Sequence, residues 1–148
     1  MYFKNLAIIL TVFLMSTGQL FAQSNRLTGL WETIDDRTGQ KKSVIKIYKK
    51  GEEYRADIVK VYWKDGDHHF CVACKDKIRH NQPIEGMNFL WGLKKHSAMM
   101  WDHGQILDPH NGQVYNLRIK KNKNILYVRA FLGLPLLGRT QEWHRYQA

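Results

Sequence analysis

The stretch that decides the fold is Thr28-Gly29-Leu30-Trp31-Glu32-Thr33-Ile34-Asp35. Gly29 leaves the backbone free to turn or to pack closely against a neighbour. Two residues later, Trp31 places a very large apolar surface on one face of an extended segment. We interpret this stretch as the first strand of a small β-barrel in which Trp31 plugs the closed end.

Residues 1–22 have the order of a secretory signal peptide: a positive charge at Lys4, an apolar run over residues 6–15, and a small residue, Ala22, at the cleavage site. The apolar run is too short to span a bilayer comfortably. No cysteine follows the run to carry a lipid anchor. We therefore expect cleavage after Ala22 and a single periplasmic or secreted domain over residues 23–148.

The formal net charge of the chain is +10 at pH 7, and the lysines are spread along the sequence, some of them in adjacent pairs such as Lys41-Lys42 and Lys94-Lys95. Such a like-charged surface favours solubility. It also leaves open a weak contact with anionic envelope components. No contiguous basic block with interleaved aromatic residues indicates specific nucleic-acid binding.

The remaining sequence alternates between short strands and turns, without helical periodicity. Strand residues, rich in β-branched and aromatic types or in period-two alternation, are expected at 30–35, 42–49, 54–63, 87–93, 98–101, 113–120, 125–131 and 139–146. A tight turn is expected at 105–112 and an apolar bend at 133–138. About eight antiparallel strands indicate a barrel or a sandwich, and we favour the barrel because closure removes exposed strand edges.

Four groups of residues resemble one family of small secreted bacterial proteins known as a domain of unknown function. They are Gly29-Leu30-Trp31 with Thr33-Ile34-Asp35-Asp36 and Thr38-Gly39, Cys71-x-x-Cys74, Ile106-Leu107-Asp108-Pro109 with Asn111-Gly112, and Leu137-Gly138-Arg139-Thr140-Gln141 with Trp143. The resemblance covers essentially the whole mature chain. It implies export and a lipocalin-like barrel, and it implies no established reaction.

Cys71 and Cys74 are the two cysteines of the chain. In an exported protein this spacing predicts a disulfide that pins the long polar loop over residues 64–82, with a gain of about 2–3 kcal/mol at most. A thioredoxin-like dithiol would need a helix N-terminus, which the pattern lacks. The alternative is a metal site formed by both cysteines with His68 and His69, although this spacing is not a common zinc arrangement.

No catalytic constellation can be assembled from the sequence, so neither an enzyme nor a cofactor is expected. Asp35, Asp36 and Asp108 occupy turn positions, where carboxylates usually accept hydrogen bonds from local backbone amides. His96, His103 and His110 also fall in expected turns.

An eight-stranded barrel either fills its interior or holds one small ligand. We expect a barrel that binds a small apolar or amphipathic molecule. The alternative is a filled barrel that acts as an envelope interaction module, contacting anionic glycolipid or a protein partner. Ligand identity and oligomeric state stay open. The aromatic and methionine residues considered for the ligand lining are Tyr48, Tyr62, Phe89, Trp91, Met99, Tyr115 and Tyr127.

Closure of the barrel makes a further prediction. If residues 30–35 pair antiparallel with residues 139–146, Arg145 lies near Trp31 and can form a cation–π contact with it. The lipocalin resemblance implies an arginine–tryptophan pair of this kind. The arginine of the family-like motif, however, is Arg139, which would fall at the opposite end of its strand, so the two candidates predict different geometries. We expect Arg145 to be the partner of Trp31 and Arg139 to shape the bend after Pro135.

Overall fold

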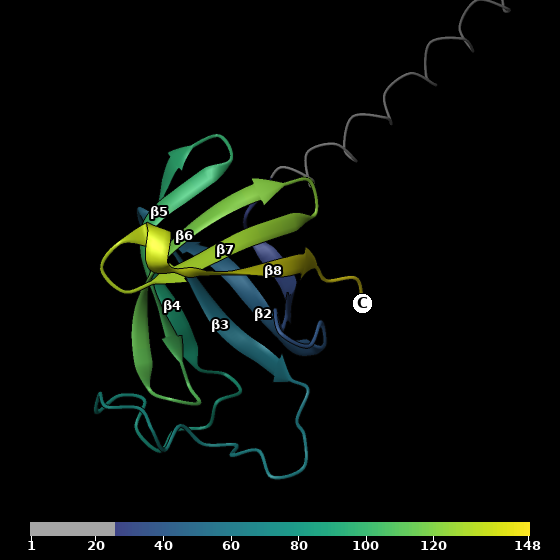
Figure 1. The fold of residues 1–148 in the computed structure, drawn as a ribbon, viewed down its shortest axis with the longest axis vertical. Coiled ribbons are helices and arrows are strands. Elements are labelled where there is room, and N and C mark those ends of the chain that lie inside the picture. Colours follow the sequence, from purple (N-terminus) through teal and green to yellow (C-terminus); the bar gives the residue numbers. More distant parts are fainter. Residues whose placement is uncertain (1–25) are drawn as a thin grey trace, which may run out of the picture.

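The computed structural model describes residues 26–148, which form an eight-stranded antiparallel barrel (Figure 1). The expected signal peptide and the first residues of the mature domain lie outside this range. The strands are β1 (Gly29–Ile34), β2 (Lys41–Lys50), β3 (Glu53–Val61), β4 (Asn88–Ser97), β5 (Met100–Asp108), β6 (Gln113–Asn122), β7 (Ile125–Phe131) and β8 (Arg139–Arg145). A short 3-10 helix, Pro135–Leu137, precedes β8. No helix within residues 26–148 has the length and hydropathy needed to cross a membrane.

Each strand pairs with the next one along the chain, and β8 returns to pair with β1. At this closing seam Trp31 lies opposite Arg145, and Thr33 lies opposite Trp143. The closed ring leaves no unpaired strand edge, which is the physical advantage of a barrel over an open sheet. The predicted antiparallel barrel is confirmed.

The barrel has a closed end and a mouth end. The short turns β2–β3, β4–β5 and β6–β7 lie at the closed end, together with residues 26–28. Trp31 is fully buried there, and its Nε1 donates to the carbonyl oxygen of Leu27 at 2.8 Å. The guanidinium carbon of Arg145 lies 3.7 Å from the centre of the Trp31 ring. These contacts plug the closed end.

The mouth end carries the connections over residues 35–40, 62–87, 109–112 and 132–138. In Figure 1 the longest of them, residues 62–87, extends from β3 along the β5–β6 turn before it enters β4. The antiparallel alternation of strands places all four connections at the same end. This end therefore contains both cysteines and most of the family-like motifs.

Two strands differ from the sequence prediction. β4 extends to Ser97, and β5 runs without interruption to Asp108, so His96 and His103 lie in strands and the turn begins at Pro109. His103 has a φ of 61°, and the β5–β6 pairing shifts register between Trp101 and Gly104. Such a bulge breaks the period-two alternation, which is why residues 98–101 resembled a short separate strand.

Candidate functional site: the barrel mouth

A cavity of about 230 Å³ opens at the mouth end of the barrel. Its inner wall is apolar and comes from side chains that strand alternation turns inward, among them Ile58, Phe89, Leu107, Val128 and Trp143, all of which are buried. Ile84, from the connection over residues 62–87, completes the apolar wall. The interior is therefore partly filled at the closed end and hollow at the mouth.

The rim of the cavity is polar. Its polar side chains come from five strands and the β5–β6 turn. They are Thr33, Lys42, Ser43, Asp108, His110, Tyr115, Arg139 and Gln141. The hydroxyls of Thr33 and Ser43 are hydrogen-bonded to each other at 2.8 Å across the β1–β2 pair. The site thus combines an apolar interior with hydrogen-bonding groups at its entrance.

An ion pair closes one side of the rim. Arg139 donates from two nitrogens of its guanidinium to the two carboxylate oxygens of Asp36, which belongs to the β1–β2 turn. The hydrogen bond from Arg139 lowers the pKa of Asp36, and the same contact raises the pKa of Arg139. The Arg139 side chain is 54% exposed, so part of its guanidinium stays accessible from the cavity entrance.

Asp35 fixes the same turn from within. Its Oδ1 accepts hydrogen bonds from the backbone amides of Arg37 and Thr38, at 3.0 and 2.9 Å. Burial acts to raise the pKa of Asp35. The hydrogen bonds and the nearby Lys42 together outweigh burial, so the pKa of Asp35 lies below its ordinary value. The expected turn role therefore holds for Asp35. It holds also for Asp108, whose Oδ1 accepts from the amide of His110 at 3.0 Å.

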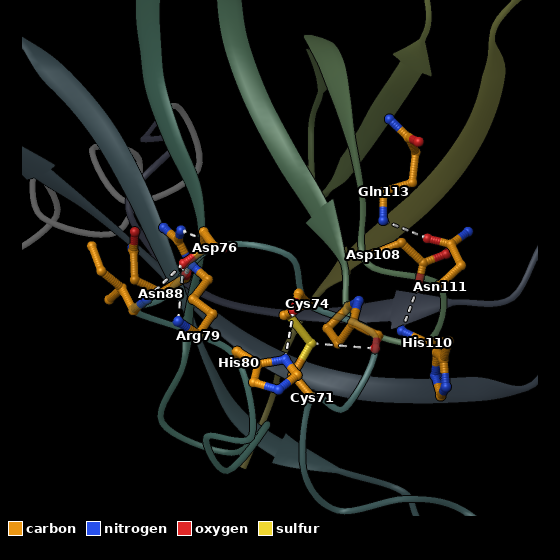
Figure 2. Close-up of a disulfide and its surroundings, with 12 residues drawn as sticks. Cys71, Cys74, Asp76, Arg79, His80, Asn88, Asp108, His110, Asn111 and Gln113 are labelled. Carbon is orange, nitrogen blue, oxygen red and sulfur yellow. Dashed lines mark hydrogen bonds and ion pairs between the residues drawn. A yellow bond between two sulfur atoms is a disulfide. The ribbon is translucent and has the colours of Figure 1, made fainter.

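The disulfide stands beside the rim (Figure 2). Cys71 and Cys74 are bonded to each other and are almost fully buried, so the predicted disulfide is present. The Cys71 sulfur lies 3.4 Å from the carbonyl oxygen of Pro109, a residue of the cavity lining. A Cβ atom at Gly112 would lie only 1.8 Å from the carbonyl oxygen of Ala73. The disulfide segment, by which we mean residues 70–82 around the two cysteines, is thus packed directly onto the β5–β6 turn.

The other side of the disulfide segment is anchored to β4. Arg79 donates from Nε to the carbonyl oxygen of Asn88 at 2.8 Å, and its guanidinium carbon lies 4.3 Å from the centre of the Trp91 ring. His80 Nδ1 lies 2.8 Å from the carbonyl oxygen of Cys74. These contacts hold the connection over residues 62–87 in one place between β4 and the β5–β6 turn.

The alternative metal site is overturned by the disulfide, because bonded sulfurs cannot serve as thiolate ligands. His69 stacks instead on Trp63, with ring centres 4.2 Å apart and planes 5° apart. Within residues 26–148 no three His, Cys, Asp or Glu side chains form a group that could hold a metal ion.

Of the seven residues considered for the ligand lining, the structure places Phe89 and Tyr115 on the cavity. The prediction is wrong for Tyr48, Tyr62, Trp91, Met99 and Tyr127, which lie elsewhere. Tyr62 donates to Glu32 at 2.7 Å, which raises the pKa of Tyr62 to about 12. Trp91 bonds Gln105, and Met99 lies in the β4–β5 turn at the closed end. None of these five lines the cavity, and residue type alone does not reveal which face a strand residue occupies.

Arg139 and Asp36 acquire a role that sequence reasoning did not give them. Asp36 was expected to bond its own turn, yet it pairs with a residue 103 positions away. The placement of Arg139 at the end of β8 opposite to Arg145 was correct, and in the antiparallel β1–β8 pair this end meets the β1–β2 turn. Combining those two observations would have revealed the pair.

Comparisons with known proteins agree with the architecture. No curated protein matches the sequence significantly. A solved structure described as "Protein HP1028 from the human pathogen Helicobacter pylori belongs to the lipocalin family" is similar with a TM-score of 0.71 and 19% identity, covering 82% of this chain and 84% of that one. At this identity the likeness shows the fold, which is lipocalin-like. The family model described as "Uncharacterized protein conserved in bacteria (DUF2147)" matches residues 29–145, and the chain therefore belongs to that family.

Proposed function

We propose that the barrel binds one small amphipathic molecule, with the apolar part inside the cavity and the polar part at the rim. The observation that supports this most directly is the cavity itself, which has a buried apolar wall and an accessible polar entrance. Ligand sites generally combine a mostly apolar lining with a few well-placed polar groups. The presence of the cavity argues against the alternative of a completely filled barrel.

The size of the cavity limits the ligand. Pockets for drug-sized molecules usually measure about 300–1,000 Å³. The cavity here, about 230 Å³, lies just below that range. The ligand is therefore compact, or only its apolar part enters the barrel.

The rim favours a ligand whose polar group accepts hydrogen bonds. Lys42, Gln141 and Arg139 supply donors there, and the hydroxyl of Tyr115 can also donate. The carboxylate of Asp108 is already engaged by a backbone amide. A carboxylate, a phosphate or a hydroxyl-rich headgroup has the acceptors that these donors require.

Titration with an amphipathic fluorescent dye, anilinonaphthalene sulfonate, followed by competition with medium-chain fatty acids, tests the proposal. Ala130→Phe is the variant that blocks the cavity, because Ala130 lines it and a phenyl ring there would occupy the space. Ala98→Phe is the control, since Ala98 is exposed in the β4–β5 turn. Dye binding should be lost in the first variant and retained in the second. Equal dye binding by both variants would contradict a site inside the barrel.

We also propose that the protein acts outside the cytoplasm. The signal-like residues 1–22 and the disulfide support this placement, because disulfides persist in oxidising compartments. Intact-mass analysis of protein from its native host should give a chain that starts near Gln23. A retained residue 1 would contradict export by cleavage.

A further inference from the structure

We propose that the leucine loop, residues 132–138 between β7 and β8, docks the protein onto an anionic phospholipid bilayer with the barrel mouth toward the lipid. Leu132, Leu134, Leu136 and Leu137 are 54%, 66%, 85% and 78% exposed. Single exposed apolar residues are ordinary on a protein surface, but a contiguous group marks an interaction site. Docking does not depend on the ligand proposed for the cavity.

The leucine loop is held in one conformation by Arg129 of β7. Its Nε donates to the carbonyl oxygen of Pro135 at 2.7 Å, and its Nη2 donates to that of Leu136 at 2.9 Å. Nη1 donates to the hydroxyl of Thr140 at 2.8 Å. The exposed leucines thus lie on a loop in which the carbonyl groups of Pro135 and Leu136 already have donors.

Hydrogen bonds between backbone groups of the leucine loop also hold it in this conformation. The amide of Leu137 donates to Leu134 at 3.1 Å, and that of Gly138 donates to Pro135 at 3.2 Å. An unpaired backbone group is costly to bring into an apolar phase. The carbonyl oxygens of Leu134, Pro135 and Leu136 and the amides of Leu137 and Gly138 are thus paired before contact, which lowers the cost of bringing this part of the loop to the headgroup boundary.

A basic groove adjoins the leucine loop on the outer face of β6, β7 and β8. It is lined by Arg118, Lys120, Tyr127, Arg129, Pro135, Leu136 and Thr140. Lys120 is exposed and forms no ion pair within the described chain, residues 26–148. Aliphatic side chains beside a free ammonium group match a phospholipid, which offers acyl chains beside a phosphate. The net charge, +10 for the full sequence and one unit less without Lys4, adds long-range attraction to an anionic surface.

The distribution of exposed apolar residues sets the orientation. Within residues 26–148, seven of the ten exposed large apolar side chains belong to two mouth-end connections: the four leucines, and Phe70, Val72 and Ile78 of the disulfide segment. The leucine loop is flanked by Ala130 and Arg139, which both line the cavity. Docking through this end would face the cavity toward the bilayer. In this orientation an amphipathic ligand could pass directly between the lipid and the cavity. This consequence rests on the proposed function.

Vesicle co-sedimentation tests the docking surface on protein purified as its host produces it, with the same N-terminus in every variant. Vesicles of phosphatidylcholine alone are compared with vesicles that also contain phosphatidylglycerol. The test variant is Leu134→Ser/Leu136→Ser/Leu137→Ser, and the control is Val59→Ser/Met99→Ser, which removes exposed apolar side chains from β3 and from the β4–β5 turn, outside the leucine loop. All five side chains are substantially exposed, so both variants should fold.

We expect binding to the anionic vesicles, weakened at least tenfold in the leucine variant and unchanged in the control. Lys120→Gln should weaken binding about fivefold, which corresponds to about 1 kcal/mol for one basic residue near an anionic surface. Dye binding in the cavity should be intact in the leucine variant, so a failure of docking is distinguishable from a failure of the proposed function. Equal vesicle binding by the leucine and control variants overturns the proposal. So does a wild-type dimer that the leucine variant makes monomeric without any vesicle binding.

Discussion

Arg145 occupies the space in which residue 29 would carry a side chain. A Cβ atom at Gly29 would lie 2.7 Å from Nη1 of Arg145, and Gly29 has a φ of +120°, which side chains disfavour. Nη1 also donates to the carbonyl oxygen of Thr28 at 3.0 Å. The glycine of the Gly-x-Trp start is therefore explained by the arginine of the last strand.

Gly29→Ala should destabilise the barrel more than Gly51→Ala. Gly51 also has a positive φ, +61°, but no atom would lie within 4 Å of its new Cβ. Left-handed strain alone costs about 1 kcal/mol or slightly more. Displacement of the guanidinium should add at least about 1 kcal/mol at position 29. Urea unfolding of both variants measures the difference, and equal costs would show that Arg145 moves aside freely.

Trp31 and Arg145 should be energetically coupled. Trp31→Ala is expected to cost about 3–5 kcal/mol, because it leaves a cavity at the closed end. A double-mutant cycle with Arg145→Gln should give a coupling above about 0.5 kcal/mol, from the cation–π contact. The control cycle pairs Trp31 with Arg139 at the mouth end and should give none. The reverse pattern would mean that the stabilising arginine is Arg139.

The Asp36–Arg139 pair should contribute stability at neutral pH that is lost in acid. The pKa of Asp36 is lowered in the folded protein from its ordinary value of 3.8. The contribution is therefore fully present above that value and disappears as the pH falls through the lowered folded pKa. Because the arginine is half-exposed, we expect about 0.2–1 kcal/mol. The stability difference between wild type and Asp36→Asn should be constant near pH 7 and shrink below about pH 4. A difference that persists at pH 2 would point to a role other than charge.

Removal of the disulfide should loosen one connection and leave the barrel folded. The closed loop is short, so the chain-entropy gain is about 2 kcal/mol. In Cys71→Ser/Cys74→Ser, hydrogen exchange should accelerate at the amides of Cys71 and Asn81, which donate to Gln82 and Cys71. Amides of β6 and β7 should keep their protection. Global unfolding of the variant would show that the disulfide supports the whole barrel.

The sequence alone predicts the eight-stranded barrel, but it does not predict which strand residues face the interior. Period-two alternation and turn residues predicted the antiparallel barrel and the placement of Arg145 beside the first strand. The β3–β4 pair shifts register between Tyr54 and Ala56 and again between Ala56 and Asp57, opposite the part of β4 that contains Trp91, so simple alternation does not give the face of this residue. A reading based on residue type therefore placed Trp91 on the cavity, although Trp91 faces Arg79 outside it.

The cavity rim depends on contacts between residues that are far apart in the sequence and meet only in the folded barrel. The Asp36–Arg139 pair joins the β1–β2 turn to the first residue of β8, 103 positions away, and only the antiparallel β1–β8 pairing brings the two residues together. The packing of Ala73 on Gly112 likewise decides where the disulfide segment lies. The cavity volume is the space enclosed by the barrel backbone minus the volume of the side chains that point inward. Amino-acid composition does not determine this difference.

The contact between Arg145 and the start of the described chain has a practical consequence. Nη2 of Arg145 donates to the carbonyl oxygen of Arg26 at 2.6 Å, so the beginning and the end of the barrel meet at its closed end. Ends this close permit circular permutation of the described barrel, residues 26–148, in which a short linker joins them and a new opening is cut in the β4–β5 turn. Immobilising the protein through a tag after Ala148 would likewise leave the mouth facing solution, because β8 ends at the closed end of the barrel.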